Sequence, residues 1–414
     1  MAQVNITLNQ EEILQLLSSD DSADVLKSLL QKSLNQFLVA ESTEMLRAEP
    51  YERTKDRTDS RNGFRERPLT TRIGTITLAV PRHRDKPFHT MNFENYQRSE
   101  TALITTMAEM VISGVSTRKI SNIMETLCGK EFSRSTVSEA CKHLDEEVET
   151  FRNRPIEARK YPFLMLDATY FKVRENHKIR AKAFMVAVGI TKEGNREVLG
   201  FDLYEDESNS SWCSFIQQLK NRGLQYVVMF TSDAHPSIRY AMNREYPEAV
   251  WQRCQFHFTR NILDATPKSY KAGLESELRE MFNAKSFPEA ERLRDSILQD
   301  YSDVAEKAMD ILENGFEDSM VVTLLPNEMR QSLRTSNTVE RLNGELKRRS
   351  YVIKVFPNPE SVIRLMGSVT IDYNDLLIAR RKMFYNTSIS KITDQIRDQL
   401  MHIARMQANR DQVA

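Results

Sequence analysis

The sequence has few cysteines and no long apolar run, and both shortages exclude classes of protein. Four of its 414 residues are cysteines, without the spacing of a disulfide framework, so reduced thiols are expected. The longest apolar runs, such as residues 183–190, fall well short of the roughly 20 residues that cross a bilayer. The N-terminus lacks a basic segment followed by an apolar one, so we expect no secretory signal. The composition therefore predicts a soluble cytoplasmic protein with no membrane partner.

The sequence also has no net charge, because Lys+Arg and Asp+Glu both total 58. The overall balance therefore says nothing about nucleic acid, but the distribution is uneven. Residues 51–86 contain ten Lys/Arg against five Asp/Glu. This surplus could lie on a phosphate backbone, and a solvated basic surface is the alternative.

The N-terminal third is mainly helical in pattern. Leucines and valines recur near a 3.6 period over residues 10–48, residues 54–67 resemble a basic loop or arm, and residues 71–80 alternate as a strand that ends at Pro81. Residues 117–126 and a helix capped by Ser133 flank a turn that contains Gly129, which is a helix-turn-helix layout. Arg118, Lys119 and Arg134 are its candidate DNA contacts, although helical bundles that never bind DNA share the layout.

The central region predicts an α/β (α+β) fold with a mixed five-stranded sheet of RNase H-like order. Three β-rich runs joined by short turns predict an antiparallel meander, and a helix that buries Trp212 follows and ends at Gly223. A fourth strand leads to a helix opened by Pro236, and a fifth strand precedes a helix after His257. The five predicted strands are residues 162–174, 179–191, 196–204, 226–233 and 249–254.

A charged helical stretch without strand signals, residues 270–330, predicts an insertion, and helix resumes at Thr338 and again in the tail, residues 374–412. The expected domains are an N-terminal helical segment (1–50), a basic arm with a small β element (51–98), a helix-turn-helix-like DNA-binding region (99–158), the first part of the catalytic core (159–265), a helical insertion (266–332), the second part of the core (333–385) and a helical tail (386–414).

Three carboxylates are the candidate chemical groups. Asp167 lies within the first predicted strand, where a buried carboxylate is costly unless a cation compensates it. Asp233 closes the fourth strand, which the proposed order places beside the first, so the two acids would repel each other without a metal. Read singly, each could be a turn or cap residue; together with the strand order they favour a functional site.

Glu340 is the third acid, and two interpretations stay open for it. It follows Asn337 at capping-box spacing, so it could serve only to cap a helix. It also shares a helix face with Gly344 and Lys347, and more positive charge follows at Arg348 and Arg349. Carboxylate, glycine and base on one face suit a metal ion and DNA phosphate. Three carboxylates predict two Mg²⁺ ions, with Mn²⁺ as a substitute, for in-line phosphodiester chemistry.

Five motifs together resemble the IS256-type, or Mutator-like, DDE transposases: LMLDATYFKVR, WCSFIQQLKNRGL, TSDAHPSIRYAM, WQRCQFHFTRNIL and RTSNTVERLNGELKRRSYVIKVFPN. The resemblance covers residues 40–385. It includes 65 residues between the first two acids and 106 between the second acid and the glutamate. It implies Asp167, Asp233 and Glu340 as the catalytic, metal-binding triad, and it places Cys254, His257 and Trp212 in the active-site neighbourhood.

The resemblance also implies an activity and partners. The expected function is cleavage at the terminal inverted repeats of an insertion sequence and strand transfer of the freed 3′-hydroxyl to target DNA. The expected protein is a homodimer or higher oligomer near the bacterial nucleoid. Lys347, Arg348 and Arg349 would add to the DNA contacts.

Alternatives to these expectations stay open. Without the family, Cys254 and His257 form half a zinc site, and a packed cysteine beside a hydrogen-bonded histidine is the preferred interpretation. At the level of function, a host-adopted nuclease without strand transfer and a DNA-binding regulator are the competing hypotheses.

Overall fold

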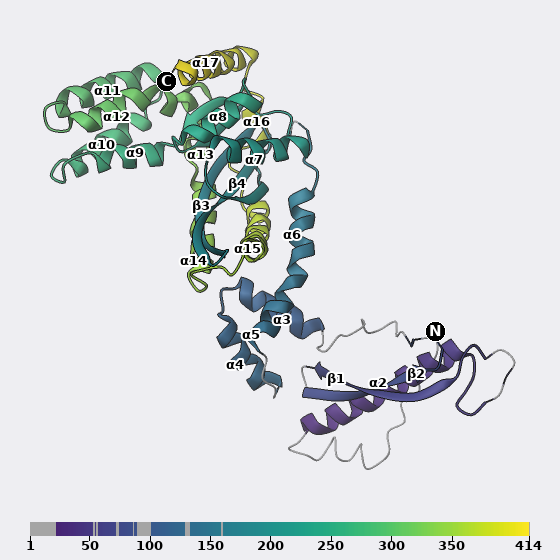
Figure 1. The fold of residues 1–414 in the computed structure, drawn as a ribbon. Coiled ribbons are helices and arrows are strands. Elements are labelled where there is room, and N and C mark those ends of the chain that lie inside the picture. Colours follow the sequence, from purple (N-terminus) through teal and green to yellow (C-terminus); the bar gives the residue numbers. More distant parts are fainter. Residues whose placement is uncertain are drawn as a thin grey trace. The chain divides into compact units, whose positions relative to one another are not determined.

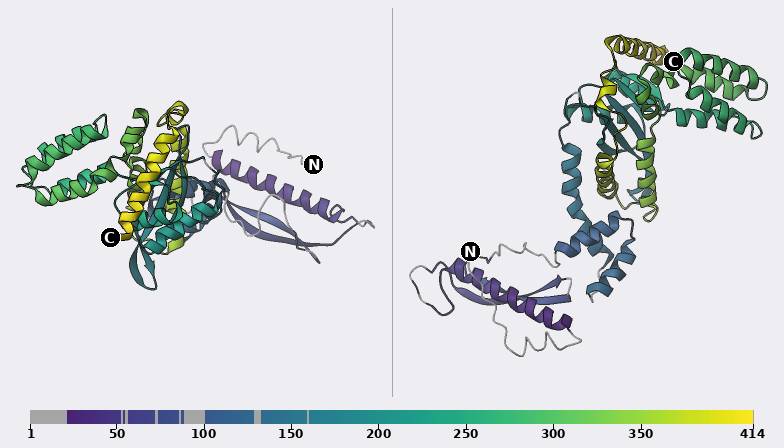
Figure 2. Two further views of the ribbon diagram at one scale, coloured as in Figure 1. Left: turned by 90° about the horizontal axis from the view of Figure 1, so that it is seen from above. Right: turned by 180° about the vertical axis from the view of Figure 1, so that it is seen from behind.

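The computed structural model describes residues 22–413 apart from 53, 55, 56, 72, 73, 86, 89–100, 129–132 and 159 (Figure 1). The chain forms two compact units, Met1–His143 and Leu144–Ala414. Two further views separate the elements of each unit (Figure 2).

The first unit begins with a helix packed on a two-stranded antiparallel sheet. Leu38 of α2 contacts the apolar face of the sheet, to which Leu69, Ile76 and Leu78 contribute. The helix predicted over residues 10–48 is confirmed from residue 22 onward, and residues 10–21 lie outside the described part of the chain. The three elements are α2 (Ser22–Leu46), β1 (Arg61–Thr71) and β2 (Gly74–His83).

Two details of this prediction are wrong. The second half of the expected basic loop is strand, because residues 61–67 pair with β2 despite their polarity; Arg65, for example, lies opposite Val80. Pro81 does not end β2, which continues to His83 with Pro81 opposite Phe64. A two-stranded sheet has only edge strands, where a proline can lie without the loss of a ladder hydrogen bond.

The helix pair expected at residues 117–143 is present. Ser133 caps the second helix by accepting a hydrogen bond from the amide of Thr136 at 3.1 Å. Ile120, Met124 and Val137 form a small core with Leu103 and Met107. The turn, residues 129–132, lies outside the described residues. The elements are α3 (Thr101–Ile112), α4 (Thr117–Cys128), α5 (Arg134–Ala140) and the 3-10 turn η1 (Cys141–His143).

The second unit contains a mixed five-stranded sheet with the order β5-β4-β3-β6-β7. The meander β3-β4-β5 is antiparallel, whereas β6 pairs in parallel with both β3 and β7. The predicted mixed five-stranded sheet, with the fourth strand beside the first, is therefore confirmed, and the last two strands are shorter than expected. The strands are β3 (Phe163–Glu175), β4 (Lys178–Ile190), β5 (Arg196–Tyr204), β6 (Met229–Ser232) and β7 (Val250–Arg253).

Helices cover the sheet on both faces. On one face α7 (Asn209–Asn221) and α8 (Pro236–Glu245) bury a core that includes Leu164 and Leu166 of β3. Because side chains alternate along a strand, Asp167 points to the opposite face, where α14 (Asn337–Ser350) and α15 (Pro359–Ala379) contact the sheet.

Gly223 ends α7 as predicted, at a φ of +119°. A Cβ at this position would lie 2.2 Å from the carbonyl oxygen of Ile156, so the chain can pass here only with glycine.

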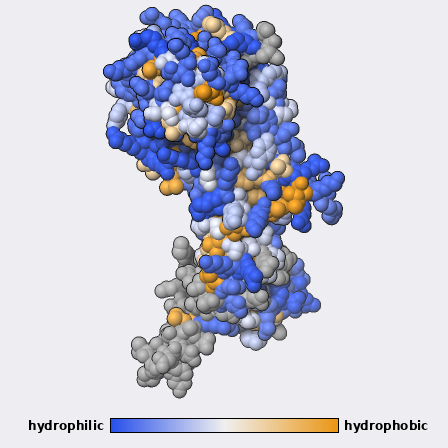
Figure 3. Space-filling model, turned by 90° about the vertical axis from the view of Figure 1, so that its left-hand side faces the viewer, coloured by the Kyte–Doolittle hydropathy of each residue, from blue (hydrophilic) through white to orange (hydrophobic). Residues whose placement is uncertain are grey.

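The region between β7 and α14 is helical, as predicted. It forms its own core around Phe258, Leu278, Leu312 and Phe316. In Figure 3 this region faces the viewer in the upper part, and its surface is mostly hydrophilic. Its helices are α9 (Gln255–Asp264), α10 (Lys271–Phe282), α11 (Phe287–Tyr301), α12 (Glu306–Ser319), the 3-10 turn η2 (Val321–Leu324) and α13 (Asn327–Leu333).

The tail is helical, as expected, with α16 (Asn386–Ile389) and α17 (Asp394–Val413). Gln407 of α17 binds both the amide and the carbonyl of Trp251 at 2.9 Å, which fastens the tail to the edge strand β7. The second unit also includes α6 (Leu144–Asn153). Among the described helices, none is long and apolar enough to cross a bilayer.

Candidate catalytic and metal-binding site

Asp167 lies in the middle of β3 and is held by two hydrogen bonds. Its Oδ1 accepts the amide of Ala168 at 2.8 Å, and its Oδ2 accepts Nδ2 of Asn343 at 2.9 Å. Asn343 is 6% exposed and lies on α14, one turn after Glu340. The hydrogen bond therefore ties the helix of the third acid to the strand of the first. Asn343 was not predicted from the sequence, where its i+3 spacing from Glu340 was the available signal.

The carboxyl of Asp167 has a strongly shifted acidity. Burial raises the pKa of Asp167 to about 7, and the negative charge of Asp233 adds to the rise. The hydrogen bonds from Ala168 and Asn343 and the charge of His257 oppose it without cancelling it. Two neighbouring carboxyls repel each other when both are ionised, which together with desolvation disfavours the charged form of Asp167.

Asp233 follows the last residue of β6. In the parallel pairing, Met165 lies opposite Thr231, and both acids lie two residues further on, so the register places Asp167 and Asp233 side by side at the same edge of the sheet. The Oδ1 of Asp233 accepts the amide of His235 at 3.1 Å, just before α8.

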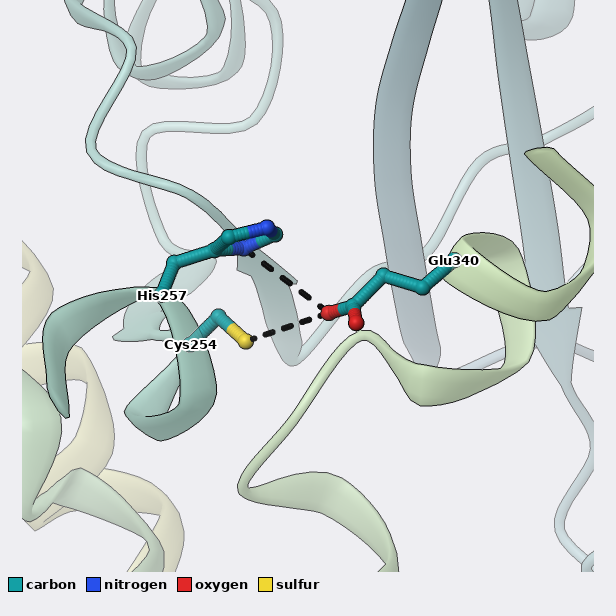
Figure 4. A group of neighbouring side chains, drawn as sticks. All are labelled: Cys254, His257 and Glu340. Carbon is teal, nitrogen blue, oxygen red and sulfur yellow. Dashed lines mark hydrogen bonds and ion pairs between the residues drawn. The ribbon is translucent and has the colours of Figure 1, made fainter. Parts of the chain in front are cut away.

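Glu340 lies in the first turn of α14, and its carboxylate turns toward α9. Its Oε1 accepts the hydroxyl of Ser336 at 2.8 Å and lies 3.7 Å from Sγ of Cys254 and 3.8 Å from Nδ1 of His257 (Figure 4). The capping-box interpretation is wrong, because the N-cap is Ser336 rather than Asn337 and no side chain caps this helix. The carboxylate is instead used in a tertiary network.

Cys254 and His257 come from the start of α9, which begins at Gln255 rather than after His257 as predicted. Cys254 is fully buried, and its sulfur accepts the amide and the hydroxyl of Ser336 at 3.4 and 3.3 Å. Donor atoms of Cys254, His257 and Glu340 lie within 4.8 Å of one another, the one such three-donor group among the described residues. The third donor comes from 86 residues away from Cys254, so local spacing could not reveal it.

The imidazole of His257 has a raised pKa, which favours its protonated form at neutral pH. Contact with Cys254 raises the pKa of His257 to about 9 against the effect of burial, and the charges of Glu340 and Asp167 contribute to the rise. Among the described residues its Nδ1 has no hydrogen-bond partner, since 3.8 Å to Glu340 is too long for one. The imidazolium therefore offsets part of the negative charge of Glu340 and Asp167 without a hydrogen bond from Nδ1 to either.

Trp212 is fully buried in α7 and packs edge-on against Phe215, with ring centroids 5.9 Å apart. Trp212 belongs to the core beneath the sheet. Glu207, in the loop before α7, is a fourth acid that was not predicted from the sequence. Burial raises the pKa of Glu207, with a lowering influence from His235 and a raising one from Asp233. Glu207 thus lies in the electrostatic field of the candidate site.

Most of the expected DNA contacts are exposed, but Arg349 is half-buried. Arg118 and Lys119 are exposed on α4, while the side chain of Arg134 lies outside the described set. On α14, Lys347 is exposed, whereas Arg348 and Arg349 both bind Glu345 at 2.7 Å. These hydrogen bonds lower the pKa of Glu345 to about 2, so one carboxylate offsets part of the positive charge.

Comparison with known proteins bears on this arrangement. The family model for the Mutator family of transposases matches residues 1–379. The chain belongs to the Mutator family of transposases. It is similar to the transposase for insertion sequence element IS256 in transposon Tn4001 of Staphylococcus aureus, with 40% identity over 93% of this chain and 99% of the relative.

Two further relatives of this Mutator-family chain cover nearly as much. The transposase for insertion sequence element ISRM5 of Rhizobium meliloti is 38% identical over 87% of this chain and 89% of its own length. The transposase for insertion sequence element IS1081 of Mycobacterium tuberculosis is 33% identical over 91% of both. The resemblance inferred from five motifs is thus confirmed as family membership, and the relatives support a transposase function.

Proposed function

We propose that this transposase is a DDE enzyme with an RNase H-like core. It would cut DNA at the terminal inverted repeats of its element and join the freed 3′-hydroxyl to target DNA. The observation that carries the proposal is Asp167: a half-buried mid-strand carboxyl, in register with Asp233 and hydrogen-bonded to the helix of Glu340, with a pKa raised to about 7. A carboxyl whose pKa is shifted by desolvation together with a specific charged partner is a candidate for a functional group.

Part of the oxygen donor set for a divalent metal is in place. Asp167 and Asp233 offer hard oxygen donors from two adjacent strands, whereas the carboxylate of Glu340, the third expected ligand, is turned toward Cys254 and His257 and would have to rotate to join them. The Oδ1 of Asn343 is buried with no hydrogen-bond partner among the described residues, and it is another oxygen at the same place. Bound Mg²⁺ or Mn²⁺, two ions in the proposal, would supply activation of the attacking oxygen and stabilisation of the leaving oxygen.

The protein's own groups then have distinct tasks. Asp167 must lose its proton before it can serve as a ligand, and Asn343 orients the carboxylate through Nδ2. Ser336 orients Glu340 through Oε1, and the His257 imidazolium moderates the negative charge between substrate phosphate and acids. In the first step water displaces a 3′ oxygen at phosphorus and leaves a 3′-hydroxyl. In the second step that hydroxyl displaces a 3′ oxygen of target DNA, so no energy-rich cofactor is consumed.

Exposed basic residues of both units would bind the DNA. Arg118 and Lys119 would contribute from the helix pair and Lys347 from α14. A Cβ at Gly344, on the same face as Glu340, would meet no atom of the protein within 4 Å, so this face of α14 is open to a phosphate backbone. We propose at least a dimer, because one element has two ends to be joined.

The experiment that tests the proposal uses a duplex that carries the element's own ends, incubated with Mg²⁺ and either wild type or Asp233→Asn. We expect wild type to nick at the end and to join the 3′-hydroxyl, and the variant to bind without cutting. Cutting without joined product would favour a nuclease. Binding by both proteins with no cutting even in Mn²⁺ would favour a DNA-binding regulator and reject the catalytic triad.

A further inference from the structure

A groove lies between α9 and α10, and the segment just before α14 also lines it. It has a volume of about 550 Å³, which is within the range of sites for small molecules and much too small for a duplex. Residues of α9, of α10 and of the linker before α14 line it, among them Phe256, Arg260, Lys271, Arg279, Arg334 and Thr335.

The groove is continuous with the candidate active site along the chain. Gln255 of its lining follows Cys254, and Thr335 precedes Ser336, so the two segments that hold Glu340 also form the groove floor. The amide of Gln255 binds the carbonyl of Arg334 at 3.0 Å, which joins these segments. The ring of Phe256 lies 5.6 Å from that of His257. A DNA strand bound at Glu340 would therefore lie near the groove.

The charge of the groove is positive. Four cations line it against two acids, Asp264 and Glu275, which form exposed and weak pairs with Arg260 at 3.8 Å and with Arg279 at 3.4 Å. Arg334 directs its guanidinium to neutral oxygens, the carbonyl of Phe282 and the side chain of Asn283 at 2.8 Å. Its positive charge is therefore left to act on a ligand, and an anionic one fits.

Phe256 narrows the choice of anion. Its ring is 50% exposed, although it belongs to a helix whose neighbours Cys254 and Phe258 are fully buried. A phenyl ring offers a phosphate neither a positive charge nor a hydrogen-bond donor, but it can stack on the flat face of a base. Paired bases in a duplex do not present that face, so the base must be unpaired. We infer that the α9–α10 groove binds an unpaired nucleotide of the DNA strand next to the cleavage site, with Phe256 stacked on the base and Lys271, Arg279 and Arg334 around the phosphate. This inference rests on the proposed function, since it supposes that DNA is bound at Glu340.

The test compares two DNA probes with the full-length protein in EDTA, so that no cleavage occurs. One probe is a blunt duplex, and the other is the same duplex with a six-thymine 3′ extension. Base stacking contributes enough that we expect wild type to prefer the extended probe about tenfold and Phe256→Ala to lose most of that preference. Tyr240→Ala, which removes a ring that is 48% exposed on α8 outside the groove, should keep it. Ultraviolet cross-linking of 5-iodouracil in the extension should label the peptide that contains Phe256.

Three results would overturn the inference. Phe256→Ala could weaken binding of both probes equally, or it could leave the preference for the extended probe intact. It could also change the oligomeric state without DNA, as light scattering would reveal, and that result would mark Phe256 as a subunit contact. These outcomes differ from failure of the proposed function. If wild type bound neither probe, DNA binding itself would be rejected along with the groove.

Discussion

Asp167 combines burial, a neighbouring acid and a hydrogen bond from another element, and the first two make its ionised form costly. Its carboxyl pKa is raised from the ordinary value of 3.8 to about 7, so the folded state holds a proton that the unfolded state releases. Stability therefore falls as the pH rises from about 4 to about 7, and the full cost is present above pH 7.

Replacement of Asp167 by Asn should remove this cost. Without metal at pH 8, we expect Asp167→Asn to be more stable than wild type by on the order of 2 kcal/mol, with a melting temperature about 5 °C higher. At pH 4 the difference should vanish, because wild type is then protonated. Thermal melts across pH 4–8 measure this, with Asp394→Asn, whose side chain is 95% exposed, as a control without pH dependence. An equal shift at every pH would contradict the role of ionisation.

Asn343 should act as a positioning residue for Asp167. Loss of its Nδ2 hydrogen bond and of the free Oδ1 in Asn343→Leu should weaken Mn²⁺ binding and DNA cleavage about 10- to 100-fold. Electron paramagnetic resonance of Mn²⁺ reads the binding independently of activity. Asn314→Leu is the matched control, because the Asn314 side chain is exposed and donates to the carbonyl of Asp310 within its own helix, α12. Unchanged Mn²⁺ affinity in a folded Asn343→Leu protein would reject this role.

At the scale of elements, helix ends and strand register place the acids. The parallel pairing of β3 with β6 puts Asp167 beside Asp233, and Ser336, the N-cap residue of α14, holds Glu340 through Oε1 on the side of Cys254 and His257. Helix α7 packs on the sheet face opposite Asp167, and Gly223, at a positive φ, allows the chain to turn directly after this helix.

Two glycines with opposite surroundings test this. Gly223→Ala should destabilise the protein by about 2–4 kcal/mol, because a Cβ would meet the carbonyl of Ile156 at a positive φ. Gly344→Ala in α14 should be neutral or stabilise by up to about 1 kcal/mol, since the space around it is open. Chemical denaturation measures both. Similar losses of unfolding free energy at the two positions would contradict the close approach of Gly223 to Ile156 as the cause.

At the scale of the molecule, the proposed function assigns DNA recognition to the first unit and the chemistry to the second. The helix pair of the first unit exposes Arg118 and Lys119, and the acids all belong to the second unit. Arg118→Gln with Lys119→Gln should weaken DNA binding and reduce the salt slope of log K by about 2, while Mn²⁺ binding stays as in wild type. Titrations between 50 and 200 mM salt measure the slope. An unchanged slope would remove these two residues from the DNA contacts.

The sequence by itself determined the family, through five motifs in order, and the mixed sheet, through local patterns of alternation and turns. It also indicated that Asp167 and Asp233 would be neighbours, because the proposed RNase H-like order places the fourth strand beside the first. The short edge strands and the start of α9 were placed less well, since the ends of elements depend on packing.

Only the tertiary structure decided the partners of the acids. Asn343 binds Asp167 across 176 residues of sequence, and Ser336 binds Cys254 across 82. The groove between α9 and α10 likewise joins residues from three elements. Local spacing constrains only a few residues along a helix or strand, whereas such contacts arise from the packing of α14 on β3 and α9, and this packing removed the capping interpretation of Glu340.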